Sequence, residues 1–249
     1  MEIWEIVVLS LVGIVAGWLN VLAGGGSMLT VPIMIFMGMP GPVANGTNRL
    51  AIILQNITAV ATFAKKGFHN VKLSLSLSVA ASIGAVFGAQ VGVSLDGEWF
   101  NRILAIIMAG MMIIMWKGNF GKGDKKQGGE EPQRLVLGHI LMIGAGFWGG
   151  FIQIGVGFIL MPILHRVMGL NLVLTNVHKV FVILIYTFVA LAVFASQLQL
   201  EWFVGLSLAL GNAVGGYLGA QTTITKGENW IRWTLNIALV AFIIKLLFF

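Results

Sequence analysis

Two basic residues, Arg49 and Lys179, stand near the starts of long apolar stretches. A cation at membrane depth is costly and is usually kept for function, where it pairs with something anionic. Every acidic residue lies in a terminus, a loop or a polar linker, so the sequence offers these cations no carboxylate. A small anion is the partner that we expect. The alternative is that both side chains reach out to the membrane surface, because each lies only a few residues into its predicted helix.

Neutral hydrogen-bond donors surround the two cations in the sequence. Asn45, Asn48 and Asn56 have the spacing of residues on one helix face. A site with many donors and cations but no carboxylate suits a small oxyanion. We therefore expect the anion-binding residues to include the neighbouring polar side chains Thr47 and Gln55 in the first half of the chain, and Thr175, Asn176 and His178 in the second.

Glycine clusters interrupt an apolar stretch in each half of the chain. The first is Gly24, Gly25 and Gly26, followed by Ser27, and the second contains Gly155 and Gly157. A helix break in lipid is tolerated only where protein or a wet cavity covers it, and transporters build substrate sites from such breaks. Their free backbone N–H groups would add donors for an anion. The alternative is a plain loop at the membrane surface.

Two amides accompany the breaks. Asn20 lies just ahead of the first and Gln153 lies within the second. Both belong to the expected binding site, although each could equally make a buried hydrogen bond between helices.

The composition is that of an integral membrane protein. Of 249 residues, 58% are hydrophobic and only 10% are charged, whereas soluble domains carry about a quarter charged residues. The mean hydropathy is +0.94. The net charge of +6 comes from cations in predicted loops, so we expect a lipid bilayer and no nucleic acid as partner. The N-terminal stretch lacks the basic start and cleavage site of a signal peptide.

The apolar pattern predicts an all-α polytopic protein with two transmembrane parts, residues 1–116 and 135–249. A Gly-rich, charged segment, 117–134, separates them and is expected to be a flexible cytoplasmic linker. Each part begins with a glycine-broken segment too short to span twice, followed by three transmembrane helices. The predicted helices cover residues 6–23, 27–37, 44–64, 72–95, 101–116, 135–165 (interrupted), 172–194, 202–222 and 230–249.

The two parts resemble each other at an offset of about 130 residues. Pro32 aligns with Pro162, the segment 45–49 with 175–179, and 84–90 with 215–221. Placing Lys65, Lys66 and Lys226 all in the cytoplasm requires the second copy to be inverted, with each broken segment forming a hairpin. Parallel repeats with four membrane crossings each are the alternative.

Glycine pairs four residues apart, Gly84 with Gly88 and Gly215 with Gly219, are expected to be close helix contacts.

Several kinds of chemistry lack their sequence signals. There is no cysteine for thiolate catalysis, disulfides or thiol metal sites, and no G-x-S-x-G motif for a hydrolase. The triple glycine lacks the Lys-Ser/Thr of a phosphate loop, and the histidines lack metal-ligand spacing. We expect neither an enzyme nor a cofactor or metal.

His178 is the residue that could bind a coupling proton, since a bound anion would favour the charged form of its imidazole. The alternative is that His178 is a neutral hydrogen-bond donor.

The segment AGWLNVLAGGGSMLTVPIMIFMGMPGPVANGTNRLA, repeated in weaker form from Gly144 to Val180, resembles the TauE/SafE sulfite-exporter family of membrane permeases. The resemblance covers the whole chain apart from the linker. It implies a bacterial inner-membrane permease that moves a small sulfur-containing anion such as sulfite, sulfoacetate or a related organosulfonate. The second copy departs from the pattern, with Gly155-Val156-Gly157 for the triple glycine and His178-Lys179 for Asn48-Arg49. A channel-like anion uniporter and a non-transporting membrane assembly factor are the alternatives.

Overall fold

The computed structural model describes residues 3–68, 71–116 and 129–248, and all of the elements in these ranges are helical apart from one isolated β-bridge. In the first part of the chain α1 (Ile3–Leu22) and α2 (Ser27–Phe36) are followed by α3 (Gly41–Lys65), α4 (Val71–Ser94) and α5 (Gly97–Trp116). In the second part α6 (Leu135–Phe151) and α7 (Val156–Pro162), which continues into the π-helical turn η1 (Ile163–Val167), precede α8 (Leu172–Gln197) and α9 (Trp202–Phe248).

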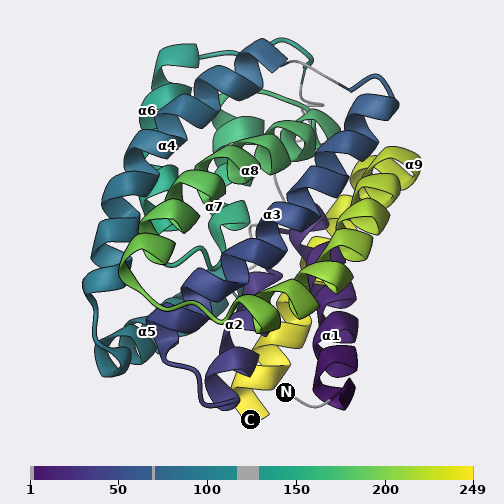
Figure 1. Cartoon of the computed structure of the whole chain (residues 1–249). Helices are drawn as coiled ribbons and strands as arrows, with labels where there is room; N and C mark the ends of the chain where they lie inside the picture. Colours follow the sequence, from purple (N-terminus) through teal and green to yellow (C-terminus); the bar gives the residue numbers. More distant parts are fainter. Residues whose placement is uncertain (1–2, 69–70, 117–128, 249) are drawn as a thin grey trace.

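Both interrupted segments fold as helical hairpins. In Figure 1, α1 enters from the end of the bundle where both chain termini lie, and α6 enters from the opposite end. The second hairpin returns to its own side, because the backbone N–H of Gln133, just before α6, donates to the carbonyl of Met168, just after η1. The predicted breaks therefore occur at the expected residues.

Four helices among the described residues are long and apolar enough to cross a membrane: α1, α4, α8 and the first 25 residues of α9. Helix α3 is equally long, but its amides and Arg49 make it too polar to qualify by composition. Most of its residues are buried, and Figure 1 shows it running between α8 and α9. A helix with few lipid-facing positions can carry polar side chains, because other helices rather than lipid surround them.

The helices cross at closely packed glycines. Gly84 and Gly88 of α4 face carbonyl groups of α6, while Gly211 and Gly215 of α9 face carbonyl groups of α1. A Cβ on any of these four would overlap with a carbonyl oxygen of the facing helix. Small residues at such crossings let two backbones approach within van der Waals contact, which is how helices pack in lipid. The expectation of close packing is confirmed for Gly84 with Gly88 and for Gly215 with Gly219, because a Cβ on Gly219 would lie 2.7 Å from the Cβ of Val21 and 3.1 Å from the carbonyl oxygen of Trp18 on α1. Gly211 adds a contact of the same kind that was not expected.

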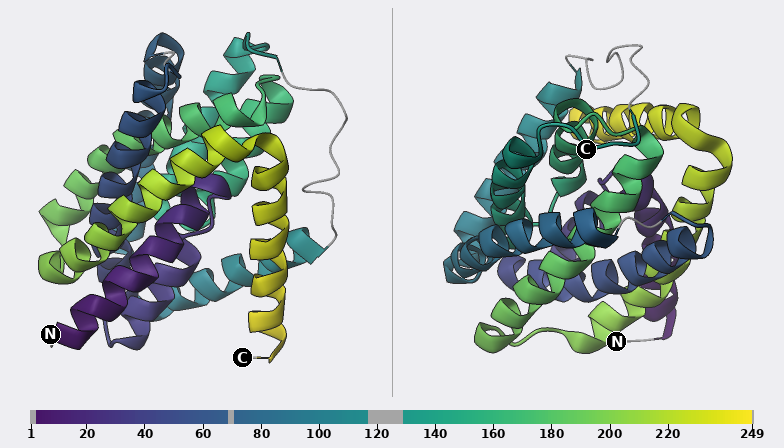
Figure 2. Two further views of the ribbon diagram at one scale, coloured as in Figure 1. Left: turned by 90° about the vertical axis from the view of Figure 1, so that its right-hand side faces the viewer. Right: turned by 90° about the horizontal axis from the view of Figure 1, so that it is seen from above.

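The prediction of a loop between residues 222 and 230 is wrong. Helix α9 is continuous over 47 residues, and Figure 2 shows it turning sharply in its C-terminal part. The residues between the two expected spans include no proline, so nothing in them removes a backbone hydrogen bond, and the helix bends instead of ending.

The linker is also more ordered at its C-terminal end than expected. Residues 117–128 lie outside the described residues. Gly129, by contrast, forms a short parallel bridge with Leu170, in which its N–H donates to the Gly169 carbonyl at 2.7 Å. Residues 129–134 are therefore attached to the turn that precedes α8.

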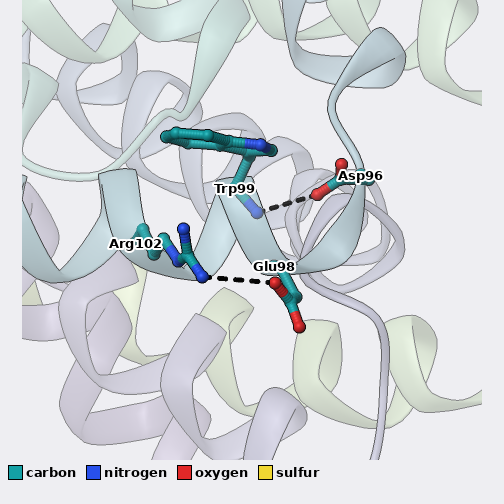
Figure 3. A network of polar contacts seen from close by, with 4 residues as sticks. All are labelled: Asp96, Glu98, Trp99 and Arg102. Atoms are coloured by element: carbon teal, nitrogen blue, oxygen red, sulfur yellow. Dashed lines mark hydrogen bonds and ion pairs between the residues drawn. The ribbon is translucent and has the colours of Figure 1, made fainter.

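Most acidic residues of the described part lie at helix ends and in connections, whereas Glu228 lies within the continuous helix α9. Figure 3 shows such a group at the start of α5. The Asp96 carboxylate accepts from the backbone N–H of Trp99 at 2.8 Å and so caps the helix, while Arg102 pairs with Glu98 at 3.4 Å and lies 5.2 Å from the Trp99 ring centre. All four side chains are exposed, so this group stabilises a helix start and forms no enclosed site.

Candidate functional site

The two helix breaks touch each other inside the bundle. Gly24 lies two residues after the end of α1 and has a φ of +84°. A Cβ on Gly24 would overlap with the Cα of Gly157. Only glycine combines that backbone conformation with so close an approach. Residues 20–28 are all buried, so the first break is not a surface loop.

The second break contains an unusual backbone conformation. Gly155 has a φ of +69° and the neighbouring Gln153 a φ of +63°, in the left-handed region that a residue with a side chain rarely adopts. The indole N–H of Trp148 donates to the carbonyl of Ile154 at 2.9 Å and holds this turn in place. A strained, buried non-glycine residue of this kind is more frequent at functional sites than elsewhere.

Arg49 caps the C-terminal end of α6. Its side chain is fully buried, and its two terminal nitrogens donate to the carbonyls of Gly149 at 3.1 Å and Gly150 at 2.5 Å. The guanidinium also donates to the Gln153 amide oxygen at 3.4 Å and lies 4.4 Å from the ring centre of Phe194. The last carbonyls of a helix have no intrahelical hydrogen-bond donor and carry partial negative charge. A buried cation supplies the missing donors and also compensates this charge.

Lys179 caps the C-terminal end of α1 in the same way. Its side chain is fully buried too, and Nζ donates to the carbonyls of Val21 at 2.6 Å and Asn20 at 3.4 Å. Each cation therefore serves a broken helix in the other part of the chain. Neither side chain reaches the membrane surface, which rules out that alternative for this conformation. The expected partner was a small anion, whereas the partners found in the structure are backbone carbonyls.

Amides on α3 connect to both breaks. The amide of Asn20 donates to the oxygen of Gln55 at 3.1 Å, and the hydroxyl of Thr30, in the first turn of α2, donates to the oxygen of Asn48 at 2.7 Å. Asn45 donates to the carbonyl of Phe151 at 2.8 Å, at the end of α6. The structure thus brings together most of the expected site residues, namely Asn20, Gly24, Gly25, Gly26, Ser27, Asn45, Asn48, Arg49, Gln55, Gln153, Gly155, Gly157 and Lys179.

Four expected residues have their contacts elsewhere. Thr47 accepts from the backbone N–H of Glu201, and Thr175 donates weakly to the carbonyl of Leu170. Asn176 donates to Thr223 on α9 at 3.4 Å. The ring of His178 contacts the hydroxyl of Ser74 on α4 at 2.8 Å. Lys179 points to the first break, whereas its neighbour His178 packs against α4, because successive residues on a helix face different directions.

Several buried polar atoms at the breaks have no hydrogen-bond partner among the described residues. They include three potential donors, Asn48 Nδ2, Arg49 Nε and the hydroxyl of Tyr186. The N-terminal end of α2, at Gly26, also lacks a side-chain cap. Buried donors are nearly always satisfied by protein, water or ligand, so unpartnered ones gathered at two helix breaks indicate a binding region.

The residue-level prediction missed Tyr186 and Phe194 on α8. The Tyr186 hydroxyl lies against Gly149, where a Cβ would come 2.6 Å from it, and Gly149 is one of the residues that Arg49 caps. An aromatic residue in an apolar stretch is ordinary, so its type gives no signal. Its position could have given one, because Tyr186 lies 130 residues after Asn56, the offset found between the two parts.

The site is positive and contains no acid. The buried polar and charged residues of the described part include Arg49, Lys179 and many amides and hydroxyls, but neither Asp nor Glu. No group of three or more potential metal ligands (His, Cys, Asp or Glu) occurs among the residues that the structure describes. Fixed donors and cations in a low-dielectric interior favour an anion, because they interact with charge more strongly there than in water.

The chain is similar to known membrane proteins over most of its length. The family model for the sulfite exporter TauE/SafE matches residues 9–246. A "Probable membrane transporter protein" of Haemophilus influenzae is 28% identical over 90% of this chain and 88% of its own length. The "Probable membrane transporter protein ORF9" of a Sinorhizobium species is 28% identical over 94% of this chain and 88% of its own.

A third relative, the "Probable membrane transporter protein YfcA" of Escherichia coli K12, is 25% identical over 97% of this chain and 89% of its own length. No solved structure matches the chain. The match covers both broken helices and all the helices that surround them, so this is a membrane protein that belongs to the sulfite exporter TauE/SafE family.

Proposed function

We propose that this protein is a secondary transporter for a small sulfur-containing anion, such as sulfite, sulfoacetate or a related organosulfonate, in the bacterial inner membrane. The observation that carries the proposal is the contact of two buried helix breaks beside unpartnered donors, with no buried carboxylate among the described residues. Transporters of several folds bind substrates at broken helices near the membrane midplane. The name of the family supports a sulfur oxyanion as the substrate class.

The transport mechanism in this proposal is alternating access between two inverted repeats. Three features support the repeats. The hairpins enter from opposite ends of the bundle (Figure 1), and the α1/α9 crossing and the α4/α6 crossing both use glycine pairs against carbonyls. Arg49 and Lys179 each cap a broken helix in the other part. A rocking motion of one repeat against the other would then change access at the breaks while the site stays between them.

The anion-binding atoms in this proposal are the free backbone N–H groups at the start of α2, the Asn48 amide and the Tyr186 hydroxyl. Asn48 is held beside α2 by Thr30, so its unpartnered Nδ2 lies near that helix start. A helix start attracts anions through its dipole and its free N–H groups. Arg49 and Lys179 contribute positive charge while their terminal nitrogens stay on the helix carbonyls.

The proposal also retains proton coupling at His178. In this conformation the ring hydrogen-bonds Ser74 on α4, so a proton there would act on helix packing rather than by direct contact with the anion. Transport by His178→Asn, which introduces the residue found at the aligned Asn48, tests this part alone. Flux that responds to an imposed pH gradient as in the wild type would remove His178 from the coupling step.

Binding to purified protein tests the function directly. Sulfite, sulfoacetate, thiosulfate and, as a comparison, chloride are added to the detergent-solubilised protein, and the unfolding temperature is recorded. A ligand that binds only the folded state raises this temperature. We expect a rise with at least one sulfur oxyanion and none with chloride. Exchange of labelled anion by proteoliposomes then distinguishes a transporter from an assembly factor, and exchange without net flux distinguishes a carrier from a channel.

Tyr186→Phe is the matched variant for this test. The Tyr186 hydroxyl makes no hydrogen bond of good geometry, although the side chains of Gln153 and Thr187 lie near it, so its removal should change the unfolding temperature without ligand only slightly. Anion affinity should fall by about 1 kcal/mol if the hydroxyl donates to the substrate. Unchanged affinity for every anion that binds the wild type would remove Tyr186 from the site and leave the α2 start and Asn48 as its donors.

A further inference from the structure

A separate cavity lies between α3 and α9, away from the helix breaks. The two helices touch where Gly216 of α9 faces the carbonyl of Gln55, and a Cβ on Gly216 would overlap with that oxygen. Beyond this contact towards the end of α3 they enclose a cavity of about 590 Å³. Its lining residues are Thr58, Ala61, Thr62, Lys65, Lys66, Ala213, Val214, Tyr217 and Gln221. Val214 and Tyr217 are about half exposed, so the cavity opens sideways onto the lipid-facing surface.

The wall of the cavity changes character along its length. Small apolar side chains, Ala61, Ala213 and Val214, line it near the glycine contact. Lys65 and Lys66 lie at the end of α3, where both are exposed. On the facing helix the amide of Gln221 donates to the Tyr217 oxygen at 3.3 Å, which leaves the tyrosine proton for another partner.

None of the residues that line the cavity is acidic. The ion pair found in the described ranges, Arg102 with Glu98, lies on α5. Lys226 follows five residues after Gln221 on α9, with its ammonium 5.5 Å from the ring centre of Trp230. Lysines accompanied by Tyr or Trp towards the end of a helix bundle are typical of the membrane–water interface, where they contact lipid headgroups.

The hydroxyl groups deeper in the cavity offer no free donor to an anion. The single hydroxyl proton of Thr58 is shared between the carbonyls of Gln55 and Ala213, each 2.8 Å from Oγ1, and Thr62 donates to the carbonyl of Thr58. Their protons are used, so they present only oxygen lone pairs to the cavity. A negatively charged group is therefore favoured at the lysine end, with an apolar group over the alanines and Val214.

We propose that this cavity binds one anionic phospholipid, with its phosphate at Lys65, Lys66 and the Tyr217 hydroxyl and an acyl chain along Ala61, Ala213 and Val214. The charge complementarity and the sideways opening select a membrane lipid over a soluble partner. The site is separate from the proposed anion site, because the residues that line it do not include any residue of the helix breaks. Thr58 connects it to the backbone carbonyl of Gln55 on α3.

Native mass spectrometry of the full chain tests the proposal, with dioleoyl phosphatidylglycerol and dioleoyl phosphatidylcholine as probes. We expect one tightly held phosphatidylglycerol and no equivalent phosphatidylcholine. Lys65→Gln/Lys66→Gln should weaken phosphatidylglycerol binding on the order of tenfold, the effect of removing two interfacial cations. Val214→Trp, which fills the cavity without changing charge, should also remove the bound lipid.

Lys72→Gln is the control, because Lys72 is an exposed cation at the start of α4 that does not line the cavity. It should keep the lipid. Equal losses in Lys72→Gln and the double variant would mean a general charge effect and overturn the site. Retention of the lipid by Val214→Trp would also overturn it, as would binding of soluble glycerol phosphate in place of the phospholipid.

Discussion

Arg49 and Lys179 differ from the cations at the helix ends in what surrounds them. Lys65, Lys66 and Lys72 are exposed, whereas both of these side chains are fully buried and end on backbone carbonyls. Removing the Arg49 charge would leave the buried carbonyls of Gly149 and Gly150 without a donor. Removing the Lys179 charge would leave the Val21 carbonyl without one, whereas the Asn20 carbonyl still accepts from the backbone N–H of Gly24. The two cations are therefore structural partners of the breaks in this conformation, whatever they contribute to binding.

Lys179→Met keeps the length of the side chain and removes its charge and donors. We expect the free energy of unfolding to fall by about 1–3 kcal/mol, the cost of leaving the buried Val21 carbonyl without a donor. Thermal unfolding in detergent measures this, with Lys72→Met as the exposed control, which should change little. Lys179→Arg should recover part of the loss. Wild-type stability with a loss of anion affinity would show that Lys179 is a ligand residue instead of a helix cap.

At the scale of the elements, the contact between the two breaks is the feature on which the site depends. The start of α2 and the end of α6 can lie beside α3 only if Gly24 and Gly157 have no side chains, since any Cβ would separate the two hairpins. The tight glycine crossings of α1 with α9 and of α4 with α6 then fix each hairpin against its neighbour. A polar α3 passes between them and supplies the amides.

Gly24→Ala should prevent the two hairpins from meeting. Gly67 offers a matched control, because it has the same φ of +84° but nothing within 4 Å of its added Cβ. Gly67→Ala should cost about 1–2 kcal/mol through backbone strain alone. Gly24→Ala adds the overlap with Gly157, so we expect little folded protein on gel filtration. Equal stability of the two variants would show that the contact between the breaks is not essential.

At the scale of the whole molecule, the arrangement of the ends bears on orientation in the membrane. Both termini lie at one end of the bundle, and the connection between α3 and α4 lies at the other (Figures 1 and 2). The cations Lys65 and Lys66 stand at that second end, and the positive-inside rule places it in the cytoplasm. Inverted repeats require Lys226 to be on the same side.

Single-cysteine labelling tests this orientation, and the chain has no cysteine of its own. Cysteines at Gly67 and Thr225 should react with a membrane-impermeant thiol reagent only after the cytoplasmic side is opened. Cysteines at Gly38 and Ser196 should react from outside in intact cells. Thr225→Cys that reacts only from outside would reject the inverted arrangement and favour parallel repeats.

The amino-acid sequence by itself determined the class of the protein, the positions of both breaks and the polar face of α3. These features have local causes: apolar length matches the membrane, glycine allows the backbone of Gly24 and Gly155, and polar residues mark a helix shielded from lipid. The same holds for the glycine pairs. Their small size is a property of the residues themselves, so their role in packing could be read before any partner was known.

Only the tertiary structure decided what the two buried cations contact. Their partners are backbone carbonyls of Gly149, Gly150, Asn20 and Val21, and a carbonyl is present at every position, so it leaves no mark in the sequence. Tyr186 escaped prediction for a related reason, because its hydroxyl matters only through its place beside Gly149. The continuity of α9 was not predicted either, because the polar residues and Gly227 between its two expected spans also suit a loop. Contacts between residues a hundred positions apart arise when the helices assemble, and no local pattern encodes them.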